Sequence, residues 1–138
     1  MKSTGASEER KKSLLELRLA RDSRAPDRAR RAVKVLRPLV DPSTYDDVKL
    51  LVSELVTNSV QHAGSDSDSW VGVRLYVLPK AVRVEVTDSG PGFRPRTGTV
   101  PRDRDSGRGL YLVGAISDRW GVDREGITRV WFEIAASA

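Results

Sequence analysis

Three polar side chains spaced one helical turn apart are the residues of this chain best suited to chemistry. Glu54, Asn58 and His62 follow one another at i, i+4 and i+8, so they share one side of a helix. The apolar stripe of that helix runs beside them and consists of Val48, Leu51, Val52 and Leu55. A carboxylate, an amide and an imidazole next to a buried face cost on the order of a few kcal/mol unless they are paired. The segment is therefore either a helix whose apolar stripe gives way to a polar end, or the lining of a binding site.

Two glycine-rich segments add a second kind of chemistry, the binding of anions by backbone N–H groups. Gly107 and Gly109 come directly before a helical pattern, and amides at a helix N-terminus bind phosphate, although a flexible entry to the helix is the alternative. Asp88 follows a strand pattern and precedes Gly90 and Gly92, an arrangement that an ordinary turn also explains. The Walker lysine motif is absent, which excludes a P-loop. Gly107 does not follow a strand of a βαβ unit, which argues against a dinucleotide fold.

The elements that must position these groups follow from the periodicity of the apolar residues. Alternation predicts strands over residues 15–19, 71–77, 82–86, 120–122 and 130–134. The helical period predicts helices from Ala25 to about Pro38, from about Tyr45 to a C-cap at Gly64, and from Gly107 through Ile116. This order predicts an α+β fold, a two-layer sandwich with helices on one face of a mainly antiparallel mixed sheet.

Turn residues predict how these elements begin and connect. Pro79-Lys80 predicts a hairpin between the second and third strands. Ser43 and Asp46 form a weak capping box for the second helix. Residues 93–106 are rich in Pro, Gly, Thr and Arg and show no periodicity, which predicts a long loop.

Composition limits the class of protein. A chain of 138 residues, 38% hydrophobic and 31% charged, predicts one domain with one core. We expect residues 1–12 to be a disordered tail and residues 13–138 to be the domain. With no cysteine and one histidine, disulfides, thiolate metal sites and histidine-rich metal sites are excluded. No transmembrane run or secretory signal is visible, so we expect a cytoplasmic protein that does not contact a membrane.

The net charge of +5 is concentrated near the N-terminus, where residues 1–37 hold 12 Lys/Arg and 5 Asp/Glu. Such a segment can bind nucleic acid or an acidic protein, or it can be a solvated face. No stacking aromatic residues interleave with these arginines, which argues against nucleic-acid binding.

Three segments taken in order closely resemble one superfamily. They are residues 53–64 (SELVTNSVQHAG), 88–93 (DSGPGF) and 106–113 (SGRGLYLV), and the last strand, 130–134 (VWFEI), also fits. The chain resembles the ATP-binding domain shared by gyrase-type topoisomerases, ninety-kilodalton heat-shock chaperones, histidine kinases and mismatch-repair proteins. Within this histidine-kinase-like superfamily it is most similar to the small bacterial anti-sigma factor serine/threonine kinases. The resemblance extends from about Leu14 to Ala135.

The resemblance implies a role for each central residue. Asn58 would bind Mg²⁺ through its side-chain oxygen, and Glu54 would act as the base or orient the attacking group. Asp88 would accept a hydrogen bond from the adenine amino group, which favours adenine because guanine presents a carbonyl there. His62 would either assist the phosphates or order the helix end. Thr128, with a register uncertain by one residue, would meet adenine through water.

The remaining implied ATP-binding positions lie in the glycine segments and the loop between them. The positions are Gly90, Gly92, Gly107, Arg108, Gly109 and Leu110. Residues 93–106 would form an ATP lid, whose arginines either contact phosphate or belong to a solvated surface. These arginines are Arg94, Arg96, Arg102 and Arg104, with Arg108 beyond the loop.

The implied function is that of an ATP-binding regulatory protein serine/threonine kinase. It would transfer the γ-phosphate of ATP to a serine of a small antagonist (anti-anti-sigma) protein and hold a sigma factor, thereby controlling transcription. The alternative is a non-catalytic, ATP-gated protein-binding module. Relatives of this kind often form homodimers, although the sequence shows no self-complementary apolar surface.

Overall fold

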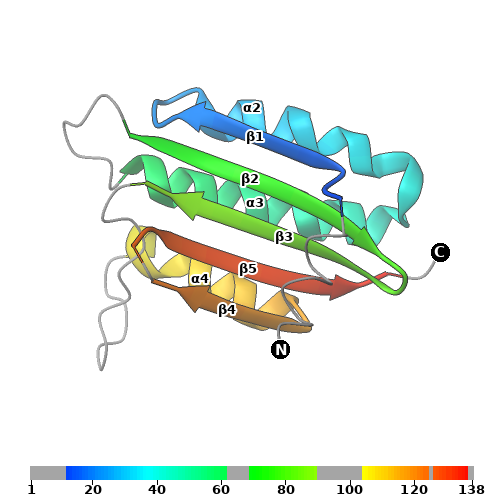
Figure 1. Cartoon of the computed structure of the whole chain (residues 1–138). Helices are drawn as coiled ribbons and strands as arrows, with labels where there is room; N and C mark the ends of the chain where they lie inside the picture. Colours follow the sequence, from blue (N-terminus) through cyan, green and yellow to red (C-terminus); the bar gives the residue numbers. More distant parts are fainter. Residues whose placement is uncertain (1–11, 62–68, 90–103, 125, 137–138) are drawn as a thin grey trace, which may run out of the picture.

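A computed structural model describes residues 12–61, 69–89, 104–124 and 126–136. Figure 1 shows two layers, a five-stranded sheet with its helices packed on one face. The strands are β1 (Leu15–Ala20), β2 (Trp70–Leu78), β3 (Ala81–Asp88), β4 (Arg119–Asp123) and β5 (Thr128–Ala135). The helices are α2 (Ala25–Ala32), the 3₁₀ segment η1 (Val33–Leu39), α3 (Pro42–Gln61) and α4 (Arg104–Ile116). The predicted α+β two-layer architecture is confirmed.

The sheet has the order β1-β2-β3-β5-β4, and each neighbouring pair of these strands is antiparallel. No parallel pair occurs among the described strands, so the sheet is antiparallel rather than mixed. Alternate residues of β2, β3 and β5 are buried in the core, as the alternation predicted, whereas β4 has no buried residue. Val84 of β3 pairs with Phe132 of β5, and both side chains are fully buried against the helices. The hairpin is also confirmed, because Leu78 pairs with Ala81 across the predicted turn.

Helix α3 is the central helix of the second layer. Its predicted apolar stripe is fully buried and comprises Val48, Leu51, Val52 and Leu55. The predicted capping box is wrong, because α3 begins at Pro42 and Asp41 caps it instead. The Asp41 carboxylate accepts a hydrogen bond from the hydroxyl of Thr44 at 2.7 Å and another from the backbone N–H of Thr44 at 3.2 Å. These hydrogen bonds lower the pKa of Asp41, and the one from the hydroxyl has the largest effect.

The other two helices differ from prediction at their ends. The first α-helix stops at Ala32, and η1 carries the chain on through Pro38 to Leu39, so Pro38 does not end the helical segment. A 3₁₀ turn suits this run of β-branched residues and proline, because its hydrogen bonds span one residue fewer. Helix α4 begins at Arg104, three residues before the predicted start at Gly107. None of the described helices is long and apolar enough to cross a membrane.

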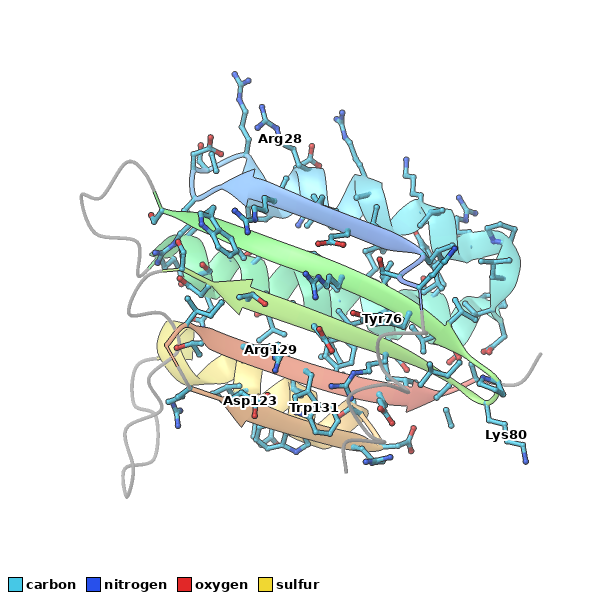
Figure 2. All side chains as sticks on the ribbon, in the orientation of Figure 1. Arg28, Tyr76, Lys80, Asp123, Arg129 and Trp131 are labelled. Carbon is cyan, nitrogen blue, oxygen red and sulfur yellow. The ribbon has the colours of Figure 1, made fainter. Side chains whose placement is uncertain are left out.

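Ion pairs cover the face of the sheet opposite to the helices. Figure 2 shows Asp123, Arg129 and Trp131 on this face, and Arg129 pairs with Asp123 at 3.0 Å. The guanidinium of Arg83 lies 4.3 Å from the centre of the Trp131 ring. A sheet face of this kind is stable in water without a covering layer. The polar residues that meet between the layers lie on the other, helical face.

Gly121 provides a stability test of the outer face. A Cβ at this position would lie 2.7 Å from Nε1 and 2.9 Å from Cε2 of Trp131, so the ring would have to move. We expect Gly121→Ala to lower the free energy of unfolding by about 1–3 kcal/mol in urea titrations. The matched control is Gly114→Ala, where the nearest atom, Nε1 of Trp120, would be 3.4 Å away. Because Gly114 lies in a helix, that change should stabilise by roughly 0.5–1 kcal/mol, and equal unfolding midpoints for the two variants would contradict the packing described.

Candidate functional site

Asp88 lies at the inner end of β3, between the sheet and α3. Val82, Val84 and Val86 face the helices, and strand alternation turns Asp88 to the same side. Its side chain is fully buried. One carboxylate oxygen, Oδ2, accepts a hydrogen bond from the hydroxyl of Ser59 in α3 at 2.5 Å.

Arg21 brings a positive charge to the other oxygen of this carboxylate. It follows the last residue of β1, and its side chain is only 1% exposed. Its Nη1 atom lies 3.3 Å from Oδ1 of Asp88, while Nε and Nη2 donate to the backbone carbonyl of Ser59 at 3.1 and 2.6 Å. Ser59 belongs to the last turn of α3, where carbonyls lack intrahelical donors and a cation is favoured. Arg21 therefore gives a partner to the buried carboxylate of Asp88 and to the carbonyl of Ser59, and they give one to its guanidinium. Without these partners, the burial of each group would cost free energy.

Neither Arg21 nor Ser59 was identified from the sequence. Arg21 lies in a basic segment whose charges could be explained as a solvated face. A signal was present in the strand, because Leu15, Leu17 and Leu19 face inward and residue 21 has the same parity. Ser59 directly follows Asn58 but carries no signal of its own.

Glu54 and Asn58 lie one turn apart on α3, as predicted. Asn58 is 4% exposed and Glu54 is partly buried. Helix α4 packs against this part of α3 at Gly109, where a Cβ would lie 3.7 Å from Nδ2 of Asn58 and 3.6 Å from the carbonyl oxygen of Glu54. Gly109 thus lies beside both predicted site residues, at distances of ordinary van der Waals contact.

Thr128 lies opposite Asp88 in the sheet. It is the first residue of β5, pairs with Asp88 across β3 and β5, and is 7% exposed. The register that the sequence left uncertain therefore places Thr128 beside Asp88. Leu110, the next residue after Gly109 in α4, is partly buried against the core.

The predicted position of the second glycine segment is wrong. Because α4 begins at Arg104, Gly107 and Gly109 lie inside the helix rather than at its first residue. The amides that lack intrahelical acceptors are those of the first turn, residues 104–107, so the amide of Gly109 belongs to the helix ladder. Gly109 instead lies within the helix, where α4 contacts α3.

Several predicted site residues lie outside the described part of the chain. They are His62, Gly90, Gly92, Arg94, Arg96 and Arg102, together with the side chains of Arg104 and Arg108 and the proposed C-cap Gly64.

The donors on α3 have the chemistry of a magnesium site that is shared with a phosphate ligand. Asn58 offers an amide oxygen, a hard oxygen donor of the kind that Mg²⁺ prefers. No group of three or more His, Cys, Asp or Glu side chains among the described residues is arranged to hold a metal. A metal with few protein ligands that completes its shell with phosphate and water fits such a set.

Helices on one face of an antiparallel sheet, with buried polar side chains of α3 and β3 meeting between the layers, define a class of two-layer nucleotide-binding domains. Residues 19–134 match the family described as the histidine kinase-like ATPase domain. The chain belongs to this family.

The chain is also similar to curated proteins named serine-protein kinase RsbW. Those of Staphylococcus aureus strains JH9 and Newman are each 30% identical to it over 103 residues, which cover 62% of this chain. The chain spans about 65% of the length of these relatives.

Proposed function

We propose that this protein is an ATP-dependent protein serine/threonine kinase of the anti-sigma factor type. The observation that carries the proposal is that α3 brings Ser59 against Asp88 of β3 and the adjacent Asn58 against Gly109 of α4, so three elements of the fold meet there. Membership of the ATPase family and similarity to proteins named serine-protein kinases support it.

The base-recognition end of the site is Asp88. A buried carboxylate is a hydrogen-bond acceptor, so it favours the amino group of adenine over the carbonyl that guanine presents at the same position. Thr128 lies beside it on β5 and adds a hydroxyl that can hold a water between protein and base.

The phosphate end of the site lies between α3 and α4. Asn58 would hold Mg²⁺, which when bound supplies charge neutralisation for the phosphates. Gly109 keeps the space beside Asn58 free of a side chain. The amides of the first turn of α4 lie at the end of a helix that favours anions.

Glu54 is the residue that we assign to the chemical step. A serine hydroxyl of the protein substrate attacks the γ-phosphorus of ATP, a new P–O bond forms, and the bond to the β–γ bridging oxygen breaks to release ADP. The carboxylate of Glu54 accepts the hydroxyl proton or orients the hydroxyl for in-line attack. Its place one turn before Asn58 puts it next to the phosphate end of the site.

The partners follow from the proposed kinase type. The protein substrate would be a small antagonist (anti-anti-sigma) protein with an accessible serine, and the regulated partner would be a sigma factor. Phosphorylation would decide which of the two the kinase holds.

Calorimetry with Mg-ATP and Mg-GTP tests the nucleotide assignment. We expect ATP to bind about a hundredfold or more tightly than GTP, since a site built around one hydrogen bond rejects the opposing group. Asn58→Ala should abolish the magnesium-dependent part of binding, whereas Gln61→Ala, an exposed residue of the same helix, should not.

Equal affinity for the two nucleotides would refute the role of Asp88 and with it the proposed function. Tight ATP binding with no phosphorylated protein under any condition would instead favour the ATP-gated binding module.

A further inference from the structure

Arg21, Ser59 and Asp88 form a closed ring of contacts. Arg21 donates through Nε and Nη2 to the carbonyl of Ser59, the hydroxyl of Ser59 donates to Oδ2 of Asp88, and Oδ1 of Asp88 lies 3.3 Å from Nη1 of Arg21. Arg21 directly follows β1, Ser59 lies in α3 and Asp88 in β3, so the ring joins the sheet to the helical layer. The side chains of Arg21 and Asp88 are 1% and 0% exposed.

Such a ring determines the orientation of the carboxylate. The terminal torsion of an aspartate is broad and roughly two-fold, so it does not hold the plane of the two oxygens by itself. Ser59 donates a hydrogen bond to one oxygen, and Arg21 lies beside the other. Only one orientation of the carboxylate plane keeps both contacts. An ionised carboxylate has about four lone-pair positions, so the contacts with Ser59 and Arg21 do not by themselves saturate it.

Arg21 is held more firmly than an ordinary arginine of the surface. Two of its nitrogens are occupied by one carbonyl, and the guanidinium is planar and rigid. Nη1 makes no hydrogen bond of good geometry to any described residue, so its role at Asp88 is that of a nearby charge with a fixed position.

We propose that Arg21 is a positioning residue for purine recognition, which aligns the Asp88 carboxylate so that it accepts a hydrogen bond from the exocyclic 6-amino group of the base. The inference rests on the proposed function, and it adds a specificity determinant from β1, outside the three segments that carry the family resemblance. The ligand class is a 6-aminopurine nucleotide. Arg21 itself need not touch the nucleotide, because it acts through Asp88.

The test compares Mg-ATP with the Mg complex of purine riboside triphosphate, which lacks only the 6-amino group. The ratio of the two dissociation constants measures the contribution of that group. In the unaltered chain the ratio should favour ATP. In Arg21→Met the preference should fall about tenfold, the size expected for a hydrogen bond to a charged group. Affinity for the analogue without the amino group should stay unchanged.

A purely structural role would weaken both ligands equally and leave the ratio where it was. The matched control is Arg24→Met, which removes an exposed arginine from the same segment and should not alter the ratio. Arg21→Lys keeps the buried charge balanced but cannot donate as a planar fork. It should fold even if Arg21→Met does not, and its ratio should also fall.

The outcomes separate the inference from the proposed function. A folded Arg21→Met or Arg21→Lys chain with the full preference for ATP overturns the role of Arg21 and leaves the proposed function intact. An equal loss of affinity for ATP and for the analogue also overturns the role of Arg21 and leaves the proposed function intact. An unaltered chain that binds neither nucleotide, or binds both equally, overturns the proposed function itself.

Discussion

Glu54→Gln should leave the affinity for Mg-ATP unchanged and slow phosphoryl transfer by roughly 10²–10⁴-fold, the usual contribution of a positioned general base. Glutamine has the same shape as glutamate but cannot take up the hydroxyl proton. The partly buried position of Glu54 on α3, one turn before Asn58, makes this a change of chemistry rather than of packing. Affinity is measured by calorimetry, and transfer by single-turnover assays with labelled ATP and a candidate protein substrate of the proposed antagonist type.

Asp46→Asn is the matched control for this experiment. It removes a carboxylate from the exposed first part of the same helix, so both affinity and transfer should be retained. Undiminished transfer by Glu54→Gln would remove Glu54 from the mechanism. If the same variant lost nucleotide binding instead, Glu54 would be a binding residue and not the base.

Asp88→Asn should lower the free energy of unfolding by about 3–5 kcal/mol, because it leaves the charge of Arg21 buried beside a neutral side chain. That is a large part of the total of roughly 5–15 kcal/mol typical of a single domain. The guanidinium of Arg21 cannot reach water without rearrangement, since its side chain is 1% exposed. Urea unfolding followed by circular dichroism measures the loss.

The double variant Arg21→Met with Asp88→Asn separates the charge effect from simple loss of packing. With both charges removed, much of the lost stability should return, and the double-mutant cycle then gives the coupling energy of the pair. Additive losses in the double variant would mean that the two charges are not coupled. Loss of ATP binding by Asp88→Asn alone does not identify the base contact, because the same change weakens the fold.

The central strands were predictable because one face of each packs against the helices and the other carries more polar residues. Alternation is a local signal, and it is clear at Val82, Val84 and Val86. The buried stripe of α3 followed in the same way from its helical period. Glu54, Asn58 and Asp88 were candidates because of their types and spacing, and the resemblance implied their roles. The structure places them on the predicted elements.

Helix ends were harder to predict because competing residues have the same chemistry. Asp41 and Ser43 are both good N-caps by type, and only the path of the chain decides which side chain reaches the first-turn amides. At α4, glycines suggested a beginning, yet the helix starts earlier at Arg104. Gly109 lies at the contact between α3 and α4, which no local pattern reports.

The Arg21 contact was not predictable for a different reason. It joins residues from β1, α3 and β3 that are distant in the sequence, and its partner at Ser59 is a backbone carbonyl. Residues 1–37 contain 12 basic side chains, and strand parity alone distinguishes Arg21 from its neighbours. Pairings of this kind depend on the assembled sheet.

The position of β1 gives the candidate site a weak point in its local stability. β1 is an edge strand, hydrogen-bonded to β2 alone in the described sheet, and edge strands fray before central ones. Because Arg21 is the next residue after β1, fraying of this edge withdraws the arginine from Asp88, and the carboxylate loses its alignment in the same event. The unpaired backbone of a frayed edge is also where another chain can add a strand and begin aggregation. Occupancy of the site and resistance to edge-to-edge aggregation are therefore linked through one residue.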